Sequence, residues 1–142
     1  MGQGVTLSCD KCGFGVHLSQ GVGMSAFDSD EDAVRAYCGN SEAKKFNALL
    51  AEKQGEISEL GYKVYECEKC GVWQQKSSLG VTFDDGTSYV RQHRCVKCRS
   101  KLDREIDIAD YGSCTNSQGL YVGTCRQCGI VGLNEICIAL WD

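Results

Sequence analysis

Proline is absent from the 142 residues, so chain reversals have to rest on the 17 glycines. No stretch approaches the roughly 20 consecutive apolar residues of a transmembrane helix, and we expect no membrane association. The N-terminal segment MGQGVTLSCD also lacks a basic region followed by an apolar run. We therefore expect a cytoplasmic protein without a secretory signal.

Positive charge is scarce as well, because 15 Lys and Arg residues against 19 Asp and Glu residues give a formal net charge of -4. Such a protein gains no bulk electrostatic help toward DNA or RNA. Hydrophobic residues make up 42% of the chain, but that figure includes eleven cysteines, and the remaining apolar stock is thin. Small domains with thin cores usually depend on disulfides or metal ions.

Cysteine is the residue that the chain has in excess. Eight of the eleven cysteines form C-x-x-C pairs, which are Cys9/Cys12, Cys67/Cys70, Cys95/Cys98 and Cys125/Cys128. A disulfide framework is the competing interpretation, but an odd total and the lack of a visible secretory signal fit it poorly. The spacing favours metal ligands, and we expect these eight cysteines to be the metal site residues.

The pairs predict two structural Zn²⁺ ions, each held by four thiolates. Two residues between cysteines let both sulfurs of one tight turn face the same ion, and a second turn completes the tetrahedron. Glycine follows three of the pairs (Gly13, Gly71 and Gly129) and suits a turn that ends at positive φ. Arg99 follows the other pair, where the same turn would cost about 1–2 kcal/mol.

Two pairings of the C-x-x-C turns are open. The segments CDKCGF and CEKCGV resemble each other, and the last two pairs share Glu-Ile ten residues after the first cysteine. The first two pairs are thus one kind of half-site and the last two pairs another. If each centre combines one half-site of each kind, the pairing is nested, 67/70 with 95/98 and 9/12 with 125/128. The alternative is sequential, 9/12 with 67/70 and 95/98 with 125/128. We favour the nested arrangement.

The C-x-x-C-G turn resembles the zinc-ribbon and rubredoxin-like families, with the best local match over Tyr62–Leu102. The overall arrangement is also similar to small, uncharacterised bacterial zinc-ribbon proteins. The resemblance brings no activity with it, and rubredoxin-like turns also accept iron. We expect a small metal-stabilised α+β fold of mostly short antiparallel strands. It would be a single compact unit over residues 1–142, with a helical insert at about 28–56 and a central ribbon at about 61–104.

Local patterns place the elements around the cysteines. Asp28 or Ser29 can cap a first helix, Gly39-Asn40 ends it, and Ser41 can cap a second helix that stops at Gly55. Residues 62–66 and 136–141 are expected to be strands, and Asp84-Asp85-Gly86 predicts a hairpin turn.

The remaining candidate residues have structural interpretations beside functional ones. Cys38, Cys114 and Cys137 lie outside the pairs and are reactive thiols, alternative ligands or small buried hydrophobes. We expect Cys137, between Ile136 and Ile138, to be a buried hydrophobe. His17 and His93 could replace a cysteine ligand, although eight paired cysteines leave little need for them. The two tryptophans, Trp73 and Trp141, are expected to anchor the core.

The sequence shows no nucleophile with a paired base and no phosphate-binding loop, so we expect a protein that is not an enzyme. A protein-interaction module with a protein partner is the favoured function. A nucleic-acid-binding zinc ribbon is the alternative, supported by one basic cluster, Arg91, Arg94, Lys97, Arg99, Lys101 and Arg104. Thiol redox chemistry ranks third, because its usual context is a single C-x-x-C pair near a βαβ unit.

Overall fold

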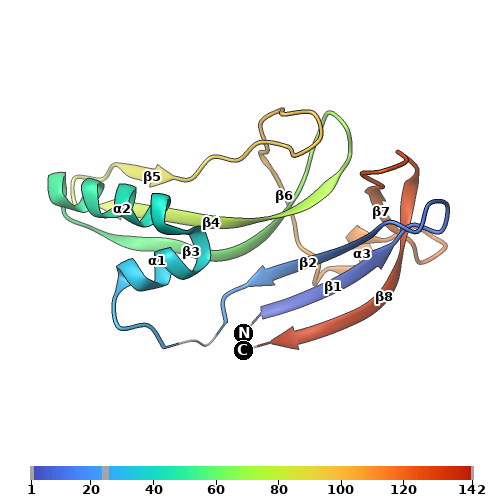
Figure 1. Cartoon of the computed structure of the whole chain (residues 1–142), viewed down its shortest axis with the longest axis horizontal. Helices are drawn as coiled ribbons and strands as arrows, with labels where there is room; N and C mark the ends of the chain where they lie inside the picture. Colours follow the sequence, from blue (N-terminus) through green and yellow to red (C-terminus); the bar gives the residue numbers. More distant parts are fainter. Residues whose placement is uncertain (1, 24–25, 142) are drawn as a thin grey trace.

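The computed structural model describes residues 2–23 and 26–141. Within them, one antiparallel eight-stranded sheet curls into a half-barrel, in the order β5-β4-β3-β2-β1-β8-β7 with β6 paired to β3 (Figure 1). The strands are β1 (Gly2–Ser8), β2 (Gly15–Gly21), β3 (Gly55–Glu66), β4 (Trp73–Phe83), β5 (Ser88–Val90), β6 (Arg104–Ile106), β7 (Tyr121–Thr124) and β8 (Val131–Trp141). The helices are α1 (Asp30–Cys38), α2 (Asn40–Glu52) and the short α3 (Tyr111–Cys114).

The expected fold class, a small α+β fold of short ribbon strands, is wrong. Strand accounts for 45% of the structure and helix for 19%, so the protein is mostly antiparallel β. β3 and β4 are 12 and 11 residues long and pair from Gly55↔Phe83 to Glu66↔Trp73. β3 also pairs with β2 at Gly21↔Tyr62. The strands that lead into the cysteine turns therefore belong to one continuous sheet.

Two helices cover one end of this sheet. The Ser29 hydroxyl accepts a hydrogen bond from the Asp32 amide at 3.2 Å, so the predicted cap of α1 is confirmed. Gly39, at φ 88°, separates the helices as expected, but it is also the N-cap of α2, a place predicted for Ser41. The helices pack on β4 through a cluster of buried apolar residues: Val34, Ala43, Phe46, Leu79, Val81 and Phe83.

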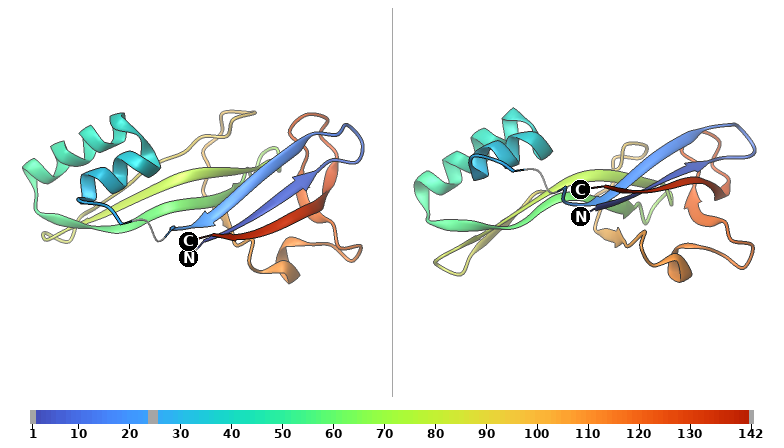
Figure 2. Two further views of the ribbon diagram at one scale, coloured as in Figure 1. Left: turned by 60° about the horizontal axis from the view of Figure 1, so that its bottom comes forward. Right: turned by 90° about the horizontal axis from the view of Figure 1, so that it is seen from below.

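The other end of the sheet has its own core. The turned views show the segment that contains α3 on the side of the sheet opposite to the α1–α2 pair (Figure 2). This core includes the ligand candidates Cys9 and Cys125 among its buried residues, with Val5, Leu7 and Leu18 beside them. β1 and β8 pair from Gly2↔Trp141 onward, which brings the two chain ends side by side (Figure 1).

None of the helices in the described ranges is both long and apolar enough to cross a membrane.

Candidate metal centres

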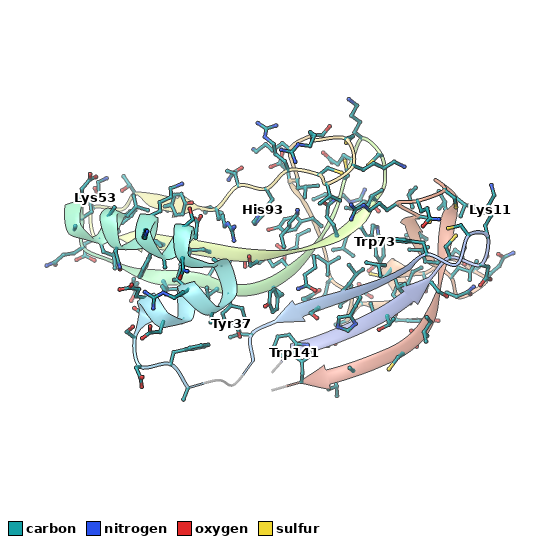
Figure 3. All side chains as sticks on the ribbon, in the orientation of Figure 1. Lys11, Tyr37, Lys53, Trp73, His93 and Trp141 are labelled. Atoms are coloured by element: carbon teal, nitrogen blue, oxygen red, sulfur yellow. The ribbon has the colours of Figure 1, made fainter. Side chains whose placement is uncertain are left out.

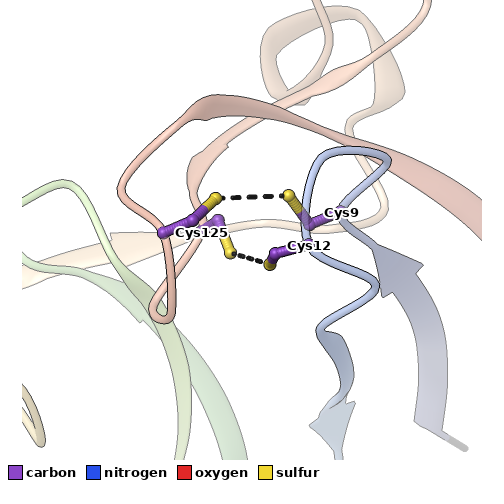
Figure 4. Close-up of side chains that lie close together, drawn as sticks. Cys9, Cys12 and Cys125 are labelled. Carbon is purple, nitrogen blue, oxygen red and sulfur yellow. Dashed lines mark hydrogen bonds between the residues drawn. The ribbon is translucent and has the colours of Figure 1, made fainter.

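The eight paired cysteines come together in two groups of four. Cys9, Cys12, Cys125 and Cys128 form the terminal centre, and Cys67, Cys70, Cys95 and Cys98 form the internal centre. In the terminal centre, the Cys9–Cys128 and Cys12–Cys125 sulfurs are each 3.6 Å apart (Figure 4). In the internal centre, the Cys67–Cys98 and Cys70–Cys95 distances are 3.4 and 3.6 Å. The turns are thus grouped in the nested arrangement and not in the sequential one.

Both groups fit a tetrahedral metal ion. Zn–S bonds of about 2.3 Å place the sulfurs of a four-thiolate tetrahedron about 3.8 Å apart. All sulfurs within each group lie within 4.8 Å of one another, and all eight cysteines are free thiols. One member of each C-x-x-C pair is fully enclosed, since Cys9, Cys67, Cys95 and Cys125 are at most 2% exposed. The donor set and its closure are those of a structural metal site.

The four C-x-x-C turns share one backbone design. In each turn the amide four residues after the first cysteine donates to that cysteine's carbonyl, at 2.7–3.0 Å. The first cysteine's own amide then donates to the carbonyl five residues on, at 2.8–3.0 Å. The residue after the second cysteine has positive φ every time: Gly13 at 75°, Gly71 at 72°, Arg99 at 65° and Gly129 at 81°. Arg99 is therefore strained where glycine would be relaxed.

Replacing Arg99 with glycine is expected to stabilise the metal-loaded protein by about 0.5–1 kcal/mol. Relief of the left-handed strain is worth about 1–2 kcal/mol, and the greater freedom of glycine in the unfolded chain offsets part of it. The midpoint of denaturant unfolding at fixed excess zinc measures the change. Arg94→Gly is the matched control, because Arg94 has no positive φ and should lose stability. A lower midpoint for Arg99→Gly would contradict the strain argument.

The thiols of the internal centre differ in acidity. Burial raises the pKa of Cys70 to about 12. For Cys95, burial acts in the same direction but is outweighed by the amides of Cys98 and Lys97 and by the Gln74 side chain, which lower its pKa to about 6. One thiol of the group therefore ionises readily while another keeps its proton, and a bound dication would supply the charge that stabilises all four thiolates.

Gln74 supports the internal centre. No sequence pattern predicts this role. Its Nε2 donates to Cys95 Sγ at 3.3 Å, and its Oε1 accepts from the Val96 amide at 3.0 Å. The side chain is 6% exposed, so both contacts form away from bulk water. Gln74 thus orients a ligand in the way that outer contacts orient metal-binding side chains. Only the pairing of β3 with β4 places it there.

The two centres are joined directly. The Thr124 amide, next to Cys125, donates to the carbonyl of Gly71, next to Cys70, at 3.0 Å, and Val72 forms a parallel bridge with Thr124. A Cβ atom at Gly71 would collide with Thr124 Oγ1. Glycine at this position therefore serves the close approach of the two centres as well as the turn.

A cavity of about 310 Å³ lies between the centres, and its wall includes Phe14, Val96 and Arg126 from three of the C-x-x-C turns and Trp73 from the start of β4. Trp73, labelled in Figure 3, is 4% exposed and donates to Glu66 Oε2 at 2.6 Å, as expected for a core anchor. Binding of metal at both centres would fix the walls of this cavity.

The remaining candidates stand apart from both centres. Cys114 is buried and donates to the Asp107 carbonyl, Cys38 is half-buried, and Cys137 is exposed on β8 rather than buried as we expected. Neither histidine belongs to a cysteine group. His17 is held by Thr6 and Ser19, and burial with nearby Arg91 lowers the pKa of His93 to about 4.

Comparison of this chain with protein-family models, with curated proteins and with solved structures found no match.

Proposed function

We propose that the protein is a non-catalytic protein-interaction module whose fold is stabilised by two structural zinc ions. Four cysteines around each centre leave no coordination position for a substrate or a catalytic water. The two centres hold the ends of β1, β3, β4 and β7, so their role is to set the shape of the sheet. A binding surface on that sheet is then the part that acts.

The observation that carries this proposal is the free edge of β8. On one side, β8 pairs with β1 from Asn134 to Trp141. On the other side, β7 reaches only Val131 and Leu133. Among the described residues, the outer side of β8 from residue 134 to residue 141 therefore has no strand partner. A long free edge is a template for another strand.

The backbone of this edge points outward at alternate residues. Cys9 donates to the Phe14 carbonyl, so the odd-numbered residues of β1 bond to β2. The even-numbered residues must then bond to β8, and Thr6 and Gly4 lie opposite Cys137 and Ala139. The N–H and C=O groups of Ile138 and Leu140 consequently face away from the sheet.

The side chains along this edge are apolar and exposed. Ile136, Ile138 and Leu140 are 64%, 56% and 73% exposed, and no charged side chain lies between Ile136 and Trp141. Natural sheets usually protect a free edge with lysine, proline or a covering loop. The partner that fits is an extended polypeptide segment with apolar residues at alternate positions, added to the sheet as a further strand.

Ile138→Lys is expected to abolish capture of protein partners. An apolar segment that paired with β8 would bury the lysine ammonium and remove its hydration, which is costly. Wild-type and variant baits would be used in pull-downs from the native host, with bound proteins quantified by mass spectrometry. Val90→Lys is the matched control, since Val90 is 51% exposed on β5 at the opposite edge of the sheet. Equal capture by the Ile138→Lys bait would refute the proposal.

The nucleic-acid alternative gains less support. Three of the six basic residues in its cluster have carboxylate partners: Arg91 with Glu42, Lys101 with Asp103, and Arg104 with Glu66. A basic surface that neutralises itself binds phosphates weakly. A gel shift with mixed DNA and RNA at low salt is the direct measurement.

A further inference from the structure

The free edge of β8 ends at a fixed point along the strand. β7 pairs with Leu133, so an incoming strand on that side can begin only beyond this residue. The stretch from Asn134 to Trp141 is therefore available, and its middle lies beside Ile138. The register shift against β1 falls between Glu135 and Cys137, so the strand is regular from Cys137 onward.

We infer that the occupant of this edge is a second copy of the same chain, with the two β8 strands antiparallel about a two-fold axis at Ile138. The inference rests on the proposed function, since it names the partner of that edge. A two-fold axis is the commonest symmetry of protein dimers, and it places the same surface on both sides of the interface.

The register follows from the length of the edge and the direction of its backbone groups. An axis at Ile138 sets Ile138 opposite its own copy, where the outward N–H and C=O groups of both chains can bond as a pair. The regular part of the edge, from Cys137 to Trp141, then faces residues 135–139 of the other chain and does not reach β7. An axis at Cys137 would drive Trp141 against the segment that β7 already occupies.

The side chains match in this register. Ile136 lies opposite Leu140 of the other chain on both sides of the axis, and Cys137 lies opposite Ala139. No like charges face each other between Ile136 and Leu140, although each chain has a net charge of -4. An edge that carried charged residues would repel its own copy, whereas this one is uncharged where the two strands would meet.

Two hollows border Ile138 and Leu140 on the sheet face that β8 shares with β1, so these side chains are loosely packed on their own chain. A cavity of about 110 Å³ is bordered by Val5, Ile108, Tyr111 and Ile138, and one of about 280 Å³ has Leu140 in its wall. Tyr111 is 51% exposed at the rim of the first hollow. Burial of these exposed apolar surfaces is the driving force that a dimer needs.

The first test is the mass of the zinc-loaded full chain by light scattering, from about 1 to 100 μM. A dimer is expected for the wild type and for Val90→Lys, and a monomer for Ile138→Lys, with two zinc ions retained in each. A monomeric wild type at the highest concentration would overturn the inference. If the Ile138→Lys bait still lost its partners in that case, the proposed function would stand with a different occupant.

The second test is disulfide trapping of the register, in a Cys137→Ser background. Directly paired residues have Cα atoms about 5.5 Å apart, within the range of a disulfide, whereas diagonal neighbours are about 7–8 Å apart. Ile138→Cys is expected to form an intermolecular disulfide under mild oxidation. Ala139→Cys, with the same background, is expected to stay unlinked. Cross-linking of Ala139→Cys alone would overturn the Ile138 axis.

Discussion

Removal of both metal ions by a chelator is expected to unfold most of this protein. Structural zinc contributes about 10–16 kcal/mol of apparent free energy at neutral pH in small metal-folded peptides. Domains of this size are stable by only about 5–15 kcal/mol in total. The ligands are also part of the apolar clusters, because Cys9 and Cys125 belong to one core and Cys67 and Cys95 to another. Four thiols in place of a metal–thiolate centre would leave both cores without their central contacts.

The helical end is the part of the structure that is expected to survive chelation. The cluster of Val34, Phe46 and Leu79 contains none of the paired cysteines, so α1 and α2 are expected to persist as frayed helices. Far-ultraviolet circular dichroism and dispersion of the amide NMR signals measure the loss, and added zinc should restore both. The absorption spectrum of the purified protein separates zinc from iron, since only iron–thiolate centres are coloured. An unchanged cooperative thermal transition in metal-free protein would contradict this prediction.

The cysteine chemistry of the centres can be read from the sequence because ligand spacing is a local property. Two residues between cysteines define one turn, and Gly13, Gly71 and Gly129 mark where that turn needs positive φ. The Asp84-Asp85-Gly86 turn can be read for the same reason, and it joins β4 to β5 with Gly86 at φ 84°. In each case a few neighbouring residues determine the geometry.

The curled sheet cannot be read in this way, because long-range pairing determines it. Residues 74–78 of β4 are Gln-Gln-Lys-Ser-Ser, without the apolar alternation that predicts a half-buried strand. Their places are set by partners on β3 and by contacts such as Gln75 Oε1 with the Ser19 amide at 2.7 Å. Polar residues here serve the internal centre and the joint between β2 and β4, and no sequence window contains both partners.

The joint between the two centres is also hidden in the sequence. There, Gly71 is a turn glycine equivalent to Gly13 and Gly129, yet those two have open space where a Cβ would lie. Of the three, only Gly71 faces a neighbouring strand, at Thr124. The two centres therefore touch through the backbone at this one contact, although each has its own four cysteines.

Loss of the terminal centre alone is expected to unfold one end of the protein and spare the other. Cys9→Ser with Cys12→Ser removes two of its four ligands, so about 10–16 kcal/mol of metal-derived stabilisation is lost there. β1, β2, β7 and β8 surround this centre and should lose their fixed arrangement. β3, β4 and the helices keep the internal centre and the separate helical core. Native mass spectrometry should show one ion in place of two.

Ligand identity in this double variant is the decisive measurement, and cadmium-113 substitution with cysteine-proton couplings reports it. The remaining cadmium is expected to couple to the four cysteines of the internal centre, Cys67, Cys70, Cys95 and Cys98. Cys38→Ser with Cys137→Ser is the matched control, because neither cysteine belongs to a group and both ions should remain. Coupling of one cadmium to Cys95 and Cys125 together would show that the centres exchange ligands. The two ends of the sheet would then not be held independently.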